Sequence, residues 1–329
     1  MAYQTAVGCS TALYIGKQSA KGTPQETGTS LFRTEVIDFP SPEPVIGWFT
    51  DPSLHAGVSD RAVYPGGISW KGTFKIRANY EGSVTMLLVA GVLGTYAAGP
   101  PITAVEAADA GYFTLFYNRG GMEPTPKFEQ LSDVRLTGFT FSCEASTGVS
   151  AMGTFEFEYV ASTYVNDHAT ISDLVPAPAV NPIIFTQAVT TTWCSGAVVA
   201  ASPMLIRPKS VKIAYKVPYD PDNFHMGTLT PDAPVRTAMN SCEWEFTEVL
   251  QGIGNVNAAK VGAVCAGPLF VNFLTTTTKQ LSFTSTGARC TKYSCTNPYG
   301  NMIETIGWKS YYHATDTGCL KVSATIAEP

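Results

Sequence analysis

Alternation of apolar and polar residues is the strongest pattern along this chain, and it predicts β-strands. In the segment WKGTFKIR (70–77), Trp70, Phe74 and Ile76 fall on one face and the polar side chains fall on the other. A strand with one face on the core and one in solvent shows this period of two. The segment GTFEFEYV (153–160) alternates in the same way. It follows VRLTGFTFSCE (134–144) across a Ser-Thr-Gly turn, and this spacing predicts a hairpin.

A run of apolar residues predicts one short helix between these strands. Ser83 can cap the helix, the run VTMLLVAGVL follows, and Gly94 can end it. A further strand is expected over YFTLFYN (112–118).

The same order of elements recurs in the second half of the chain. Strands are expected over 211–217, around Trp244 and over 280–286, a helix over 255–267, and a final hairpin of 307–314 with 319–326. Four pairs of positions have similar offsets: Trp70 and Trp244 (174), Val36 and Val211 (175), Val134 and Trp308 (174), and Phe155 and Leu320 (165). Similar offsets in a fixed order predict an internal duplication.

We therefore expect a mainly β protein with two tandem antiparallel β-sandwich or barrel domains, each with a short flanking α-helix. The expected domains span residues 31–171 and 183–329. A proline-rich linker, 172–182, joins them, and an N-terminal arm, 1–30, precedes them. Each domain carries a long insertion before its tryptophan-bearing strand, at 40–67 and 219–240, and insertions of this length are usually functional or interfacial.

Composition and charge narrow the function classes. Only 14% of the 329 residues are charged, and the net charge of -5 comes without a basic run, which disfavours a protein that grips nucleic acid. No secretory signal is expected, because the N-terminus MAYQTAVGCS lacks a charged n-region and an apolar h-region. No membrane span is expected either, because the longest apolar stretch (84–98) is too short and too rich in glycine. The sequence contains no serine-hydrolase elbow, zinc-protease motif or complete dinucleotide loop, so no enzyme activity and no cofactor are expected.

The eight cysteines and four histidines are scattered, without the close ligand pairs that are typical of zinc sites. Cys290 and Cys295 are the only near neighbours among the cysteines. Reduced, buried thiols are the simplest interpretation, and a disulfide or a metal site at these two residues is the alternative.

The segment LYIGKQSAKGTPQ (13–25) contains a Gly-Lys pair, yet it is not a phosphate-binding loop. No glycine lies five residues before Gly16, and Gln18 stands where such a loop needs Ser or Thr. GKQSAKGTP instead resembles the opening of phage tail tube proteins. The resemblance continues in the Tyr-Glu-Gly junction at 80–82 and in the leucine-rich helix that ends in Leu93 and Gly94.

This resemblance implies a structural protein of the phage virion, made in the bacterial cytoplasm, whose rings stack into the hollow tube for genome delivery. A chain with two tube-type domains would close as a homotrimer with pseudo-sixfold symmetry. The implied partners are the tail tip or baseplate, tape measure and tail terminator proteins. Double-stranded DNA would pass through the lumen without specific binding. The alternative is another β-rich virion component: a baseplate, tail terminator, decoration or adhesin protein.

Two segments are candidates for contacts between stacked rings. The N-terminal arm would contribute Lys17 and Lys21 as polar anchors and Pro24 as a stiffener. The first insertion would contribute Trp48 and Tyr64.

Charged strand faces supply the remaining candidates. Lys71, Lys75 and Arg77 form a basic face on one strand, and Glu243 and Glu245 form an acidic face on its counterpart. Pairing of these two strands between neighbouring subunits would set their register. Glu156 and Glu158 are candidates for an acidic lumen lining that repels DNA. Ordinary solvent-exposed strand faces are the alternative for both groups.

Overall fold

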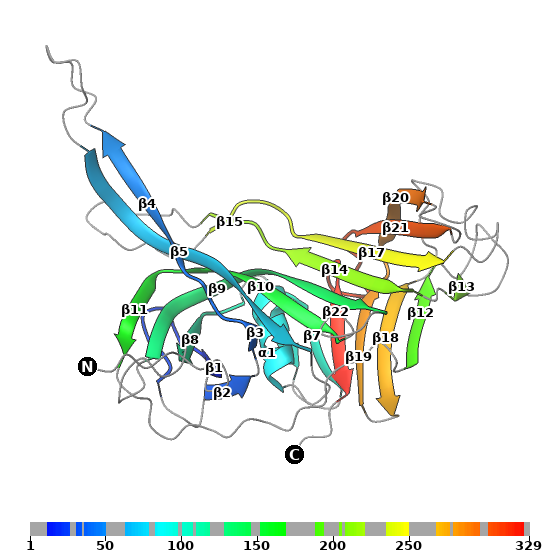
Figure 1. Cartoon of the computed structure of the whole chain (residues 1–329), viewed down its shortest axis with the longest axis horizontal. Coiled ribbons are helices and arrows are strands. Elements are labelled where there is room, and N and C mark those ends of the chain that lie inside the picture. Colours follow the sequence, from blue (N-terminus) through cyan, green and yellow to red (C-terminus); the bar gives the residue numbers. More distant parts are fainter. Residues whose placement is uncertain are drawn as a thin grey trace, which may run out of the picture.

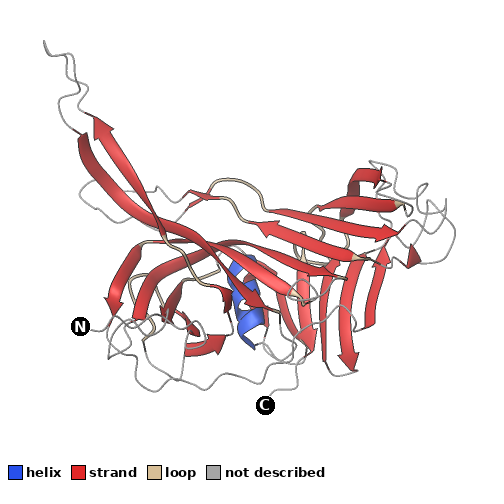
Figure 2. Cartoon of the chain, viewed as in Figure 1, coloured by secondary structure: helices blue, strands red, loops and turns tan. Residues whose placement is uncertain are grey.

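The computed structural model describes residues 12–26, 31–34, 36–50, 63–78, 83–97, 101–107, 110–118, 128–145, 152–168, 188–193, 204–205, 208–220, 235–249, 268–276, 279–296 and 302–325. Within these residues the protein is mainly β, with antiparallel sheets that do not close into barrels, and with one helix, α1 (Ser83–Leu93) (Figure 1, Figure 2). This confirms the β-rich, antiparallel fold class that the alternation predicts.

The largest layer, which we call the wide sheet, contains strands from both halves of the chain. Its central order is β5-β10-β9-β14-β17-β21-β20, with β3 and β4 along the outer edge of β5. The strands are β3 (Val36–Asp38), β4 (Glu43–Thr50), β5 (Val63–Arg77), β9 (Phe128–Glu144), β10 (Thr154–Ala161), β14 (Ser210–Lys216), β17 (Ser241–Val249), β20 (Ala288–Thr296) and β21 (Ile303–Ser310).

Two smaller layers lie on the same side of the wide sheet as α1 (Figure 1). The first has the order β2-β1-β8-β9-β11 and contains β1 (Ala12–Lys17), β2 (Leu31–Thr34), β8 (Phe113–Asn118), the first part of β9, and β11 (Thr163–His168). The second has the order β13-β12-β18-β19-β22-β7-β6. Its strands are β6 (Gly94–Ala97), β7 (Ile102–Glu106), β12 (Ala188–Trp193), β13 (Met204–Leu205), β18 (Leu269–Thr276), β19 (Lys279–Ser285) and β22 (Lys321–Thr325). A short hairpin of β15 (Tyr219–Asp220) and β16 (Val235–Arg236) stands apart from these layers.

The order of the described strands repeats between the two halves of the chain. The wide sheet reads β3-β5-β10-β9 and then β14-β17-β21-β20, while the smaller sheets read β2-β1-β8-β9-β11 and β13-β12-β18-β19-β22. The single long strand β9 therefore corresponds to two strands of the second half, β19 and β20. A bend at Thr286 and Gly287 separates these two strands. In the same way β10 and β11 correspond to β21 and β22.

The ladders contradict two of the four residue correspondences and show that the other two, the valine match and the Trp70–Trp244 match, cannot both hold. Val36 of β3 lies opposite Ile76 of β5, and Val211 of β14 lies opposite Phe246 of β17. If the two valines correspond to each other, then Ile76 of β5 corresponds to Phe246 of β17, which lies 170 residues later in the chain. The counterpart of Trp244 is then Phe74, not Trp70. The matches of Val134 with Trp308 and of Phe155 with Leu320 are wrong, because β10 corresponds to β21 and not to the strand after it. Tryptophan and valine recur often enough to align by chance.

The expected final hairpin is also wrong. β21 ends at Ser310 and pairs with β17 and β20, whereas β22 pairs with β19 and β7 in another layer. The turn at residues 314–317 exists, but it carries the chain from the wide sheet to the smaller one. The Asp316 carboxylate holds this turn, because it accepts a hydrogen bond from the Thr286 backbone N–H at 2.5 Å.

Pairing and packing join the two halves of the chain. β9 pairs with β14 in the wide sheet, and β7 pairs with β22 in the second smaller sheet. Between the layers, the Phe141 ring lies 5.2 Å from Phe273 and 4.9 Å from Phe283, measured between centroids, so one core serves both halves. The expected linker, 172–182, lies outside the described residues.

Helix α1 begins at Ser83 and ends before Gly94, as predicted, but it does not flank the fold. Its side chains are apolar all round, and it packs against β6, β7 and β9 in the interior. A helix without a polar face is expected to be buried. Gly94 has a φ of 124°, which allows the chain to turn directly into β6. The second expected helix, 255–267, lies outside the described residues.

The expected N-terminal arm is wrong for residues 12–17. They form β1, which pairs with β2 on one edge and with β8 on the other. Leu13, Tyr14 and Ile15 are all buried, so both faces of this strand are covered, as its continuous apolar run indicates. Residues 1–11 and 27–30 of the expected arm lie outside the described residues.

Candidate functional site

The wide sheet turns one face to the core, and its other face, which we call the polar face, carries rows of charged side chains. Cross-strand partners share a face, so the ladders define these rows. One row contains Lys75, Glu156, Thr140, Ala214, Glu243, Lys309 and Arg289. The next contains Arg77, Thr154, Ser142, Lys212, Glu245, Gly307 and Lys292. The two rows together carry six basic and three acidic side chains, drawn from strands of both repeats.

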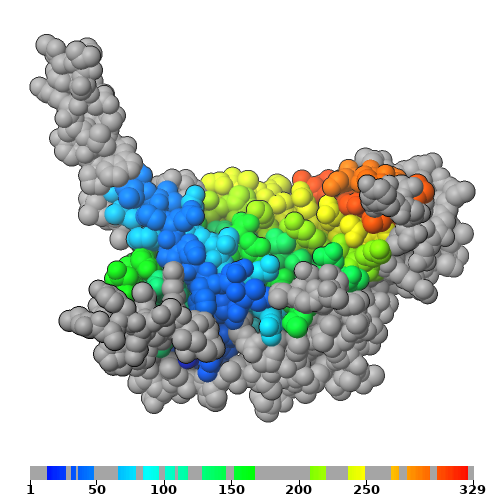
Figure 3. Space-filling view, viewed as in Figure 1, coloured from blue at the N-terminus to red at the C-terminus, as the bar shows by residue number. Residues whose placement is uncertain are grey.

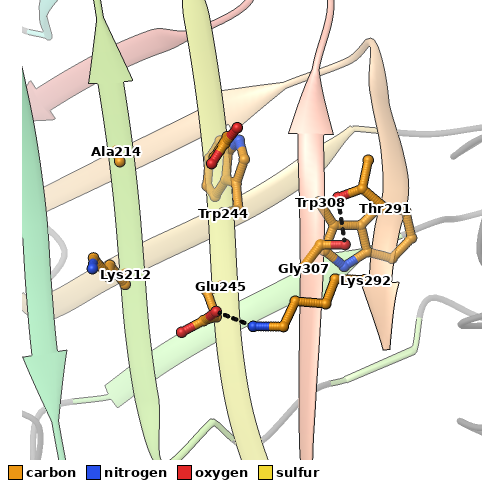
Figure 4. Close-up of a pocket in the computed structure, with 9 residues that line it drawn as sticks. Lys212, Ala214, Trp244, Glu245, Thr291, Lys292, Gly307 and Trp308 are labelled. Atoms are coloured by element: carbon orange, nitrogen blue, oxygen red, sulfur yellow. Dashed lines mark hydrogen bonds and ion pairs between the residues drawn. The ribbon is translucent and has the colours of Figure 1, made fainter. Parts of the chain in front are cut away.

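Two ion pairs on the polar face bridge across an intervening strand. The Lys216 Nζ of β14 lies 2.7 Å from Glu158 Oε1 of β10, and Gly138 lies opposite both residues. The Lys292 Nζ of β20 lies 3.1 Å from Glu245 Oε2 of β17, and Gly307 separates them (Figure 4). A Cβ on Gly307 would lie 3.0 Å from Lys292 Cβ, so glycine makes room for the lysine stem. Both pairs are solvent-exposed and contribute about 0–1 kcal/mol each.

Shallow hollows open on the polar face between these rows. One is lined by Lys212, Glu243, Glu245, Thr291 and Lys292, with Gly307 and the two tryptophans beneath it (Figure 4). A second adjoins it, with Lys75, Glu144, Ser210 and Lys212. Each hollow has two basic and two acidic side chains in its walls.

The structure changes the expected pairing of the basic and acidic strands. β17 is paired within the chain on both edges, by β14 and β21, and β5 is paired with β10 along the whole of Lys71 to Arg77. Pairing of β5 with β17 between subunits is therefore wrong. Glu243 and Glu245 instead lie opposite Lys309 and Lys212 of the same chain. The two strands differ in charge because each has its own oppositely charged neighbours.

Glu156 and Glu158 lie on the polar face, as the alternation predicts, but among cations. Glu156 is exposed and lies opposite Lys75, while Glu158 binds Lys216. An unbroken acidic lining is therefore not present on the described part of this face.

The inter-ring candidates separate into two places. Lys17 is exposed at the end of β1, and Lys21 and Pro24 are half-buried in the loop that follows. Trp48 and Tyr64 belong to the hairpin of β4 and β5, which projects from the body (Figure 1). The side chains of Trp48 and Tyr64 lie outside what the structure describes.

The loop after β1 is held by a buried polar cluster. The Gln18 amide donates to Asp133 Oδ1 at 2.9 Å, and its oxygen accepts from the Thr114 hydroxyl at 2.9 Å. The backbone N–H groups of Gly22 and Gln25 donate to Asp133 Oδ1 (2.7 Å) and Thr114 Oγ1 (2.9 Å). The motif GKQSAKGTP therefore closes a loop onto β8 and β9, and sequence reasoning missed this role.

Four further lysines of the polar face were not singled out from the sequence: Lys212, Lys216, Lys292 and Lys309. The alternation in VKIAYKV and in ARCTKYSCT was the available signal. It shows that these lysines lie on a polar face, but it does not show which carboxylates face them.

Cys290 and Cys295 do not pair. Both are free thiols of β20, with Cys290 buried and Cys295 exposed. The described residues contain no group of three or more His, Cys, Asp or Glu residues that could hold a metal ion. Among the elements that the structure describes, no helix is long and apolar enough to cross a membrane.

Glu304 is a buried acid on the core side of β21, directly opposite Glu248 of β17. Burial raises the pKa of Glu304 above its ordinary value, and the nearby Tyr293 hydroxyl partly offsets this rise. Like charges on directly opposite residues destabilise a sheet. The folded protein therefore binds the Glu304 proton more tightly than the unfolded chain does.

This raised pKa predicts a stability difference that depends on pH. The contribution of protonated Glu304 is complete below the ordinary value of 4.5 and is lost as the pH rises through the pKa of the folded state. Glu304→Gln, which cannot ionise, should raise the Tm above wild type at pH 8 and match wild type near pH 4. A gain of about 1 kcal/mol corresponds to ~2–4 °C in a large domain.

Thermal melts of both proteins across this pH range measure the effect. Glu156→Gln on the exposed polar face is the control, expected to change stability by about 0.5 kcal/mol or less at either pH. If the difference in Tm between Glu304→Gln and wild type were the same at every pH, ionisation of Glu304 would not destabilise the folded protein.

No protein-family model matches the chain, and no curated protein matches its sequence.

Proposed function

We propose that this chain is a structural protein that assembles into rings, and that the rings stack into the hollow tail tube of a long-tailed bacteriophage. The repeated strand order of the wide sheet carries the proposal. One chain places two four-strand units with the same strand order side by side, and among the described strands neither outer edge of the sheet has a further partner. Copies that add in the same direction form a ring, and three chains with two units each have pseudo-sixfold symmetry.

The polar face is the proposed lumen lining. Its two rows carry six basic and three acidic side chains, so carboxylates interrupt the basic residues and double-stranded DNA would not meet an unbroken basic surface. Strands of both repeats follow one another across the molecule, from blue through green to orange in Figure 3. The core and α1 lie on the opposite side of the wide sheet, where they would form the tube wall (Figure 2).

The projecting β4–β5 hairpin is the proposed contact between rings. It extends beyond the compact layers, as a segment that reaches a neighbouring ring must do. Trp48 and Tyr64 on it stay candidates for that contact. The implied tail tip, tape measure and terminator partners follow from the resemblance in GKQSAKGTP and belong to the same proposal.

Electron microscopy of the purified protein tests this function. We expect long hollow tubes with stacked repeats, and a reconstruction in which Glu156 and Glu158 face the bore. Isolated rings without stacking would favour a terminator, and monomers decorating a surface would favour another β-rich virion component. Catalysis does not require a polymer, so the formation of long tubes would also favour the structural role over a catalytic one.

A further inference from the structure

The junction between the two repeats shows how one unit meets the next. β9 ends the first unit and pairs antiparallel with β14, which begins the second, over seven residue pairs from Ser210 opposite Glu144 to Lys216 opposite Gly138. The corresponding strands at the outer edges are β20 and β3. Among the described strands, β20 pairs only with β21 and β3 pairs only with β5.

We propose that β20 of one copy pairs antiparallel with β3 of a second copy and so reproduces the β9–β14 junction between chains. The occupant of each open edge is a second copy of this chain. The inference rests on the proposed ring formation and assigns the edges and the register through which the ring closes.

The ladders fix the register of this junction. Phe141 lies opposite Phe155 in the first unit, and Tyr293 lies opposite Ile306 in the second. Cys143 therefore corresponds to Cys295, two residues further along each strand. Cys143 lies opposite Val211. With Val36 taken as the counterpart of Val211, as the sequence match has it, Cys295 should lie opposite Val36 of the next copy.

Burial and charge agree with this assignment. Cys143 is buried beneath the junction, while its counterpart Cys295 is exposed at an edge that nothing in the described chain covers. The β20 edge carries exposed Arg289 and Lys292, and the β3–β4 edge carries exposed Asp38 and Glu43. Opposite charges on the two edges favour head-to-tail contact and oppose contact between identical edges.

Proline limits the length of the new junction. Pro40, Pro42 and Pro44 follow β3 and cannot donate to a ladder. Backbone pairing is therefore confined to the short strand β3, and the acidic side chains beyond it supply contacts to the basic edge. A short, proline-flanked edge also restrains indiscriminate pairing of the free chain.

A cross-link tests the register. Directly opposite residues have Cβ atoms about 4.5–5.5 Å apart, close to the separation that a disulfide needs. Val36→Cys should therefore form a disulfide with Cys295 of the neighbouring copy when assembled protein is treated with copper–phenanthroline. On non-reducing gels we expect most of the chain to shift to a covalent trimer, with no larger species, and to return to monomer on reduction.

Controls separate the register from chance collisions. Val36→Cys combined with Cys295→Ser should lose the trimer. A second measurement uses the wild-type chain, so that no substitution can disturb folding. Maleimide labelling of Cys295, quantified by mass spectrometry of its peptide, should be lower in assembled than in unassembled protein. Two results would overturn the proposed pairing of β20 with β3 and leave the proposed function standing. In one, the Val36→Cys variant forms tubes without the disulfide to Cys295; in the other, Cys295 is still labelled in wild-type tubes. Absence of rings and tubes from wild type would overturn both.

Discussion

Deletion of residues 1–25 is expected to prevent folding of the chain, and not merely its assembly. The deletion removes β1, whose two ladders hold β2 and β8 together. It also removes the fully buried Leu13 and Ile15. The loss of a large buried apolar side chain costs about 2–5 kcal/mol, and the whole stability of a domain is about 5–15 kcal/mol. Two such losses and a missing strand leave little folding free energy.

Soluble yield, far-ultraviolet circular dichroism and a thermal melt measure this result. The matched control is deletion of residues 1–10, which keeps every residue of β1 and both ladders, and it should retain the cooperative melt. A folded, monomeric 1–25 deletion would show instead that β1 is dispensable and that the segment acts as an assembly arm. The comparison matters for function, because only a folded truncation can report on ring stacking.

Trp244→Ala is expected to give the largest loss of stability among single substitutions in the wide sheet. Trp244 is only 1% exposed, and its indole Nε1 donates to Ser310 Oγ of the neighbouring strand β21 at 2.7 Å. Removal of a buried tryptophan side chain costs about 3–5 kcal/mol. The substitution also leaves the buried Ser310 hydroxyl without this partner, which adds to the cost.

Urea unfolding followed by circular dichroism measures the change in free energy. Trp244→Phe keeps a buried ring and should cost less than the alanine variant. Ser310→Ala removes only the acceptor and should cost about 1–3 kcal/mol. If the alanine and phenylalanine variants were equally stable, burial of the ring at this position would not be a major source of stability.

The local elements followed well from the sequence. Strands β5, β8, β10, β14 and β19 and helix α1 occupy the segments where alternation, a capping serine and a terminal glycine predict them. These signals are local, because the side-chain period and the end residues of an element lie within the element itself. The duplication was recognisable for the same reason, since the order of elements survives where individual letters do not.

The partners of each strand were not predictable in this way. Every strand edge offers the same N–H and C=O groups, so a pattern identifies a strand and its buried face but not its neighbour. The pairing of β9 with β14 depends on contacts such as that of Phe141 with Phe283, far apart in the chain. The expected pairing of β5 with β17 failed at this point, because both strands find partners within the chain.

The polar face also shows the difference between what a local pattern predicts and what only the assembled sheet reveals. Alternation placed Glu156, Glu158, Lys71 and Lys75 on a solvent-side face, and the structure agrees. It could not show that Lys216 reaches Glu158 across Gly138, because that contact joins three strands from two repeats. An acidic strand considered alone therefore looked like an acidic surface, while the assembled sheet carries mixed charge.

The sequence by itself determined a mainly β chain and the position of helix α1. It also determined which face of each strand is apolar. Only the tertiary structure decided that residues 12–17 are a core strand, that the repeats share sheets and a core, and that β3 and β20 are the outer edges among the described strands of the wide sheet. The physical reason is that periodicity is set by neighbouring residues, whereas pairing and burial are set by which distant segments pack together.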